Sequence, residues 1–232
     1  DMLSSHQHHH LYHPSHSNVH FESYYRYQLF SNGEKDDEKA FQSLLQTLSK
    51  PLPLTFRITN KAHHECTINA LKRIISAQEQ QLHVRTISFL NDPRTFQIDN
   101  IGVNNENNGG TNDDLKTKHP NVHQFLARAN EGGDLSRQEL VSMIPVKLLD
   151  VKPSHLVLDS CASPGSKTSQ ILEVMLSKNA SGAVVANDAS LQRANLLTHR
   201  CYRLEAAAKN LVVVNHDAQT LPLELENTFD RI

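Results

Sequence analysis

The sequence has no tryptophan, only three cysteines and no long apolar run in its 232 residues. Three cysteines (Cys66, Cys161 and Cys201) do not make a disulfide framework, so we expect a reducing compartment. No segment approaches the roughly 18 consecutive apolar residues of a membrane span. The polar, histidine-rich N-terminus does not have the pattern of a secretory signal peptide. We therefore expect no membrane association.

An excess of positive charge is also missing. The chain has 23 Lys and Arg against 25 Asp and Glu, which gives a formal net charge of −2 with neutral histidines. Proteins that bind nucleic acids usually carry a basic excess. A basic surface on this chain therefore has to be local. The length is enough for one large domain or two small ones.

Two segments have too few apolar residues to form a core. Residues 1–20 are interpreted as a disordered tail, and residues 101–114, rich in Asn, Gly and Asp, as a flexible insertion. Metal capture by imidazoles is the alternative for the tail, but no fixed ligand spacing supports it, so we predict no metal site. The histidines of the tail are His6, His8, His9, His10, His13, His16 and His20.

Between and after these segments, two ordered domains are predicted. In residues 21–100, a strand at Thr55–Ile58 and an apolar helical stripe through Ile68, Leu71 and Ile75 indicate a small α+β domain of an RNA-binding type. Residues 115–232 form the second domain. Within it, Ser136 and Glu139 stand three apart before an apolar run, which predicts a capping box at the start of a helix.

The stretch LVLDSCASPGSKT, residues 156–168, is the most informative part of the chain. An apolar run ends at Asp159, a turn with Pro164 and Gly165 follows, and apolar residues then recur at helical spacing. This order predicts a strand, a turn and a helix that begins near Ser166. In open α/β sheets, ligands bind beside such turns.

Two common nucleotide-binding motifs do not match this turn. A P-loop requires G-x-x-x-x-G-K-[ST], but Ser160 stands at the first glycine position and Ser166 separates Gly165 from Lys167. A dinucleotide-binding turn requires three glycines in G-x-G-x-x-G, and this turn has one.

The run Asp-x-Cys-Ala-x-Pro-Gly-x-Lys-Thr instead resembles motif I of the Nop/Sun family of RNA cytosine-5 methyltransferases. Residues 51–60 and 135–145 are similar to sequence segments of the tRNA-modifying branch of that family. The resemblance implies the N-terminal half of a Rossmann-like methyltransferase sheet, an α/β fold, preceded by the small α+β domain. It also implies S-adenosyl-L-methionine as cofactor and RNA, most of all tRNA, as partner.

Site residues follow from the same resemblance. The residues implied to surround the methionine part of the cofactor are Cys161, Ala162, Ser163, Pro164, Gly165, Ser166 and Lys167. Asp188 and Asp217 end the next two predicted strands, Ala183–Asp188 and Leu211–Asp217. Asp188 is expected at the ribose, as is the acid of dinucleotide folds, and Asp217 at the adenine. Arg193, one helical turn beyond Asp188, is expected near the ribose.

In this family the catalytic cysteines follow the fourth and fifth strands. Here Phe229–Ile232 opens the fourth strand, so we expect no catalytic residue in the chain and no activity from it alone. The alternative is a natural, non-catalytic form that binds RNA or a partner. The expected location is the nucleus or nucleolus, with the cytoplasm as the alternative. The oligomeric state stays open.

Overall fold

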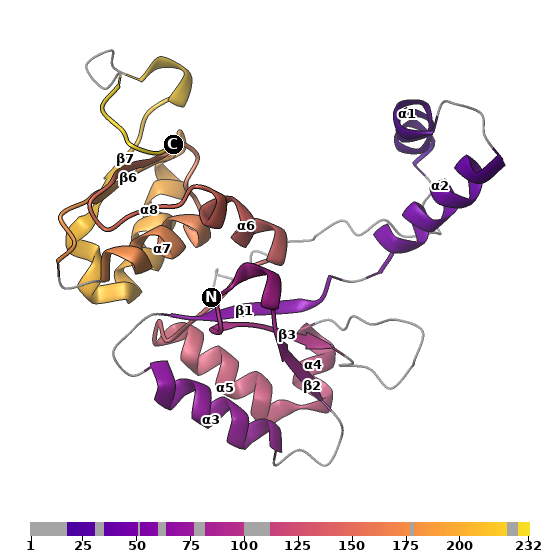
Figure 1. The fold of residues 1–232 in the computed structure, drawn as a ribbon, viewed down its shortest axis with the longest axis horizontal. Helices are drawn as coiled ribbons and strands as arrows, with labels where there is room; N and C mark the ends of the chain where they lie inside the picture. The colour runs from indigo at the N-terminus through magenta and orange to yellow at the C-terminus, as the bar shows by residue number, and fades with distance from the viewer. Residues whose placement is uncertain are drawn as a thin grey trace.

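The computed structural model describes residues 18–30, 35–50, 52–59, 64–76, 82–99, 112–176, 179–221 and 227–232. Within them the chain forms two β-sheets, each with its own apolar core (Figure 1). The helices are α1 (Val19–Leu29), α2 (Lys35–Leu48), α3 (His64–Ser76), α4 (Asn112–Lys118), α5 (Pro120–Glu131), α6 (Leu140–Leu148), α7 (Ser166–Leu172) and α8 (Leu191–Cys201). The strands are β1 (Leu54–Ile58), β2 (His83–Thr86), β3 (Thr95–Asp99), β4 (Leu135–Arg137), β5 (Leu156–Asp159), β6 (Ala183–Asn187) and β7 (Leu211–Val214). Short 3-10 helices are η1 (Ser88–Leu90), η2 (Glu173–Leu176), η3 (Tyr202–Asn210) and η4 (Ala218–Thr220).

The first sheet is antiparallel, in the order β2-β3-β1-β4. Helices α3 and α5 lie side by side on one face of it (Figure 1). Phe56 and Ile98 from the strands, and Leu71 and Leu126 from these helices, are fully or almost fully buried in a common core. The predicted strand and helix of this region are confirmed by β1 and α3.

The structure differs from three of the predicted boundaries. The second domain was predicted from residue 115, but α4, α5 and β4 complete the first sheet and its core, so the change of core comes after residue 137. Of the predicted insertion, residues 112–114 begin α4, and residues 101–111 lie outside the described part. Of the predicted tail, residues 18–20 cap and begin α1, and residues 1–17 lie outside the described part.

The predicted capping box is wrong. Ser136 lies in β4, opposite Arg57 of β1, because pairing with the first sheet takes it into a strand. Helix α6 begins at Leu140, and Glu139 at its N-cap makes no side-chain hydrogen bond to the helix.

The second sheet is parallel, in the order β5-β6-β7. On the other edge of β5, Arg231 forms a parallel bridge with Val157 and accepts a 2.9 Å hydrogen bond from the Leu158 amide. The predicted opening of a fourth strand at Phe229–Ile232 is confirmed by this bridge. Since β5 has neighbours on both sides, it lies inside the sheet, and α7 and α8 pack against it over a core that includes Ile171, Leu172 and Leu197.

Between the two sheets runs a seam of buried polar contacts. Arg57 of β1 is 2% exposed, and it donates to Glu173, 4% exposed, across 2.6 Å. Nε of Arg57 donates to Gln138, whose amide donates to Gln170 of α7, each across 3.0 Å. These contacts tie the first sheet to α7 and to η2, which follows it.

One end of this seam holds a cavity of about 260 Å³, bordered by acids and bases of both sheets. Besides the Arg57–Glu173 pair, Arg94 contacts Asp92 at 2.9 Å, and Lys147 of α6 contacts Asp92 at 3.2 Å. Burial alone would raise the pKa of Asp92, but the hydrogen bonds and charge of Arg94, together with the charge of Lys147, hold that pKa below its usual value. We call this cavity, with Arg57, Asp92, Arg94, Lys147 and Glu173, the ion-paired end.

Helices α1 and α2 lie beside one another, apart from both sheets (Figure 1). Phe30 and Arg26 contact the ring of Phe41, at centroid distances of 5.6 Å and 4.2 Å. Across the described ranges, no helix combines the length and the apolar character that crossing a bilayer requires.

Candidate cofactor site

The turn after β5 depends on Gly165. Its φ of +97° lies in the left-handed region, and a Cβ atom there would sit 2.8 Å from Cδ1 of Leu197 and 3.4 Å from Sγ of Cys201. Glycine is therefore required both by the backbone and by the close approach of α8. The Gly165 amide donates to the carbonyl of Ala162 across 2.7 Å, and the Ser163–Pro164 peptide is cis. The predicted strand, turn and helix from Ser166 are confirmed.

The seven residues of the turn divide by exposure. Cys161 and Lys167 are exposed, Pro164 and Ser166 are half-buried, and Ala162, Ser163 and Gly165 are buried. The side chains of the first four are at least partly accessible from solvent, as contact with a ligand requires. The other three shape the turn, and they can contact a ligand only through a small side-chain or backbone surface.

Asp159, Asp188 and Asp217 lie at the same edge of the sheet, as predicted. The parallel register sets Asp159 beside Ala186 and Asn187 beside Val214, so the three carboxyl ends meet there. Asp217 is exposed at the N-cap of η4, where its carboxylate accepts one hydrogen bond from the Gln219 amide across 3.0 Å.

Asp188 is 5% exposed and already holds the turn in place. Its carboxylate accepts from the amides of Ser163 at 3.2 Å and Ser190 at 3.0 Å, and it contacts Nε of Arg193 at 3.3 Å. Arg193 also donates to the Ser163 carbonyl across 2.8 Å. A carboxylate accepts about four hydrogen bonds, so Asp188 retains capacity for roughly one more. Its predicted ribose contact stays a prediction.

Asp159 joins the end of β5 to the first turn of α7. The Thr168 hydroxyl donates to its carboxylate across 2.7 Å. Burial raises the pKa of Asp159 above its usual value, and the hydrogen bond from Thr168 and the charge of Lys167 oppose that rise. Asp159, which is half-buried, therefore stabilises the turn by tying the end of β5 to the start of α7.

The sequence did not reveal Asn187, which is fully buried. Its Nδ2 donates to the carbonyls of Ser160 and His216, across 3.0 Å and 2.9 Å, and its Oδ1 accepts from the His216 amide across 2.9 Å. One side chain thus links the loops that follow all three strands. Its only signal in the sequence was its position next to Asp188 at the end of an apolar run.

The two cysteines near the site differ. Cys201 is buried in the core of the second sheet, and burial raises the pKa of its thiol to about 11. Cys161 is exposed in the turn. Among the described residues, no group of three or more His, Cys, Asp or Glu side chains is arranged to hold a metal ion.

Comparison with known proteins places this geometry in a family. Residues 146–232 match the family model of 16S rRNA methyltransferase RsmB/F. The chain is similar to the multisite-specific tRNA:(cytosine-C(5))-methyltransferase trm4b of Schizosaccharomyces pombe, with 34% identity over 88% of the chain and 32% of that protein. It is also similar to the multisite-specific tRNA:(cytosine-C(5))-methyltransferase of Saccharomyces cerevisiae, with 36% identity over 80% of the chain and 27% of that protein. The chain thus spans about a third or less of the length of these relatives.

Solved structures show the same fold. NSun6 from Pyrococcus horikoshii, determined with SFG, superposes with a TM-score of 0.58 and 16% identity, over 84% of this chain and 64% of that one. A methyltransferase homologue from Pyrococcus horikoshii gives a TM-score of 0.56 and 20% identity, over 85% of this chain and 52% of that one. The predicted α/β methyltransferase fold and the relationship to the Nop/Sun family of RNA cytosine-5 methyltransferases are confirmed.

Proposed function

From this relationship to the Nop/Sun family, we propose that the chain is the cofactor-binding part of an S-adenosylmethionine-dependent methyltransferase that forms 5-methylcytosine in RNA. The proposed substrate is tRNA, which the names of the two yeast relatives give as their substrate. The observation that carries the proposal is the turn Cys161–Lys167. It stands at the tip of β5, within the segment that matches the family model.

The residues present fit such a cofactor. A bound S-adenosylmethionine would supply an electrophilic methyl group on its sulfonium. Cys161, Pro164 and Ser166 offer partly or fully exposed surface for the methionine part, and the Lys167 ammonium can pair with its carboxylate. Asp217, exposed, is free to meet the adenine end, and Asp188 can accept one ribose hydroxyl with its remaining capacity.

Calorimetric titration of the chain with S-adenosylmethionine tests the cofactor site. We expect saturable binding that Asp217→Asn weakens about tenfold without a change in melting temperature, because Asp217 is exposed and caps only η4. Asp188→Asn should abolish binding and lower the melting temperature, because its carboxylate also holds the turn. Asp113→Asn, an exposed acid on α4, is the control and should bind as the wild type does. Equal affinities in all four proteins would refute the site.

Transfer of a labelled methyl group to a tRNA transcript by the protein that carries this chain tests the activity. Label in 5-methylcytosine supports the proposal. Cofactor binding without methyl transfer to RNA favours the non-catalytic alternative, a form that binds RNA or a partner. Nuclear location is proposed from the family relationship alone, and microscopy of a fluorescent fusion tests it.

A further inference from the structure

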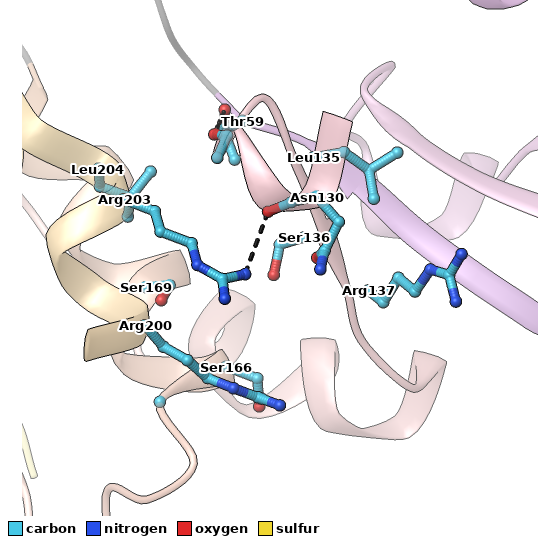
Figure 2. Close-up of a pocket in the computed structure, with 12 residues that line it drawn as sticks. Thr59, Asn130, Leu135, Ser136, Arg137, Ser166, Ser169, Arg200, Arg203 and Leu204 are labelled. Carbon is cyan, nitrogen blue, oxygen red and sulfur yellow. Dashed lines mark hydrogen bonds between the residues drawn. The ribbon is translucent and has the colours of Figure 1, made fainter. Parts of the chain in front are cut away.

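The opposite end of the seam holds a second cavity, of about 220 Å³ (Figure 2). We call the first sheet with the helices packed on it the first unit, and the second sheet with its helices the second unit. The first unit contributes Thr59, Asn130 and Ser136 to this cavity, and the second unit contributes Ser166, Arg200 and Arg203. At about 30 Å³ for each water molecule in the liquid, the space is that of roughly seven waters. It can therefore take a ligand group of several atoms.

The charged side chains among the described residues that line this cavity are all arginines. None of the described residues that line it is Asp or Glu. Neither Arg200 nor Arg203 forms an ion pair with an acid in the described part of the chain. Arg200 is exposed and Arg203 is half-buried; partial burial of the guanidinium, and after it the like charge of Arg203, lowers the pKa of Arg200. We call this cavity the arginine end of the seam.

The directions of the side chains fit a ligand between the two units. Figure 2 shows Arg203 pointing across the cavity toward Asn130, whose carbonyl accepts its Nη1 hydrogen across 3.1 Å, while Arg200 extends beneath Ser166. Arg137 turns its guanidinium away from this pair and donates to Asn112 across 2.9 Å. The remaining donors of Arg200 and Arg203, with the hydroxyls of Ser136 and Ser166, suit a tetrahedral oxyanion.

We propose that the arginine end binds a backbone phosphate of the RNA substrate. The 232-residue sequence is negative as a whole, so a contact with RNA within it requires positive charge that is local and uncompensated, and this cavity meets that condition. Ser166 lines it and also belongs to the candidate cofactor turn, so a phosphate held here keeps the strand next to that turn. The inference rests on the proposed function and adds to it a contact shared by both units.

The test uses the whole chain with the double variant Arg200→Gln/Arg203→Gln. We measure the affinity for a tRNA transcript by fluorescence anisotropy across a series of salt concentrations. The variant should bind about tenfold more weakly at low salt, and its slope of log K against log salt should be smaller by about 0.7 to 0.9, the loss of one phosphate contact. The matched control removes two exposed arginines of α3 and α5, Arg73→Gln/Arg128→Gln, and should change both quantities less.

Three outcomes overturn the proposal. The first is that the wild type does not bind the tRNA transcript, and the second is that the double variant and the control variant have the same affinity and the same salt slope. The third is that the cavity binds inorganic phosphate but not RNA. This third outcome is recognised if inorganic phosphate raises the melting temperature of the wild type but not of the double variant, while the wild type and the double variant bind RNA with the same affinity. Titration with S-adenosylmethionine separates the two hypotheses. Cofactor binding with RNA affinity unchanged in the variant refutes only the phosphate contact, and the expected RNA result without cofactor binding refutes only the proposed function.

Discussion

The two ends of the seam are cavities of similar size that differ in charge balance: one is lined by both acids and bases, and the other, among the described residues, by arginines without an acid. Both lie between the same two units and both are lined by arginines. At the ion-paired end, Glu173 and Asp92 lie within 4 Å of the cations of Arg57, Arg94 and Lys147. At the arginine end, no described acid faces Arg200 or Arg203. A buried charge that is matched within the chain serves the architecture, whereas an unmatched charge on a partly exposed cavity wall, such as that of Arg200 or Arg203, is available for a ligand.

The largest expected effect comes from breaking the match at the ion-paired end. Arg57→Ala leaves Glu173 buried without its 2.6 Å partner, so it should lower the free energy of unfolding by about 3–5 kcal/mol. Arg85→Ala in the same sheet removes an ion pair with Asp99 in which Arg85 is 53% exposed, so it should cost at most about 1 kcal/mol. Urea denaturation measures both values. Losses of equal size would show that Arg57 is not held as the structure has it.

The next largest effect is expected at Gly165, which belongs to the candidate cofactor turn and also lines the arginine end. Gly165→Ala adds a Cβ 2.8 Å from Leu197 at a φ of +97°, so it should cost about 1–3 kcal/mol and weaken cofactor binding. Gly132→Ala is the control, because its φ is −72° and its nearest neighbour would be 3.4 Å away. That control should stay within about 0.5 kcal/mol of the wild type. Differential scanning calorimetry and cofactor titration compare the two, and two neutral variants would contradict the tight approach of α8.

Removing one charge from the arginine end sharpens the contrast. Arg200→Gln relieves its repulsion with Arg203, so stability should stay the same or rise by up to about 0.5 kcal/mol. The corresponding change at Arg57, Arg57→Gln, should lower the stability because Glu173 loses the nearer of its two charged partners and keeps only Arg94 at 3.5 Å. Urea midpoints at low and high salt give the comparison. A clear loss of stability in Arg200→Gln would mean that the arginine is structural and would weaken the phosphate proposal.

The smallest expected effect is a difference in how Asp92 and Asp159 make the stability of the protein depend on pH. The lowered pKa of Asp92 contributes stability that is present above its unfolded pKa of about 3.9 and is lost as pH falls through the folded value. The raised pKa of Asp159 acts in the opposite sense, since stability falls as pH rises from the unfolded to the folded value. Asp92→Asn should therefore flatten the acid side of the stability curve, and Asp159→Asn should steepen it. Urea midpoints from about pH 3 to about pH 7 measure this, and parallel curves for both variants would contradict the two opposite shifts.

Much of the second unit could be predicted because its signals are local. The apolar runs that end in acids correspond to β5, β6 and β7, and the glycine turn leads into α7. The seam could not be predicted in this way. Arg57 and Glu173 lie 116 residues apart, and nothing near either residue indicates that it is buried. The partners of a buried polar side chain are known only once the two units are packed.

The wrong predictions have the same cause. Ser136 and Glu139 satisfied a local capping rule, but strand pairing with β1 took Ser136 into β4. The start of the second domain at residue 115 followed a change in composition, whereas α5 and β4 belong to the core around Phe56. Asn187 was missed for the opposite reason. An amide at the end of an apolar run resembles any loop residue until its three hydrogen bonds, to Ser160 and His216, are seen.

Asn187 is also a position at which spontaneous deamidation would damage the structure. Asparagine is the side chain that loses ammonia spontaneously to become aspartate, and here it is followed by Asp188. At this position both amide hydrogens are directed at carbonyl oxygens, those of Ser160 and His216. Deamidation would replace that donor with an anionic acceptor, so two attractive contacts would become repulsive and the loops after the three strands would separate. The burial that makes Asn187 an effective link also protects it, because ammonia is lost when the backbone nitrogen of Asp188 attacks the side-chain carbonyl of Asn187, and that nitrogen is held by a 3.2 Å hydrogen bond to the Val214 carbonyl. The rate at which Asn187 deamidates, and with it the loss of the candidate cofactor site over time, should therefore follow the rate at which this edge of the sheet opens.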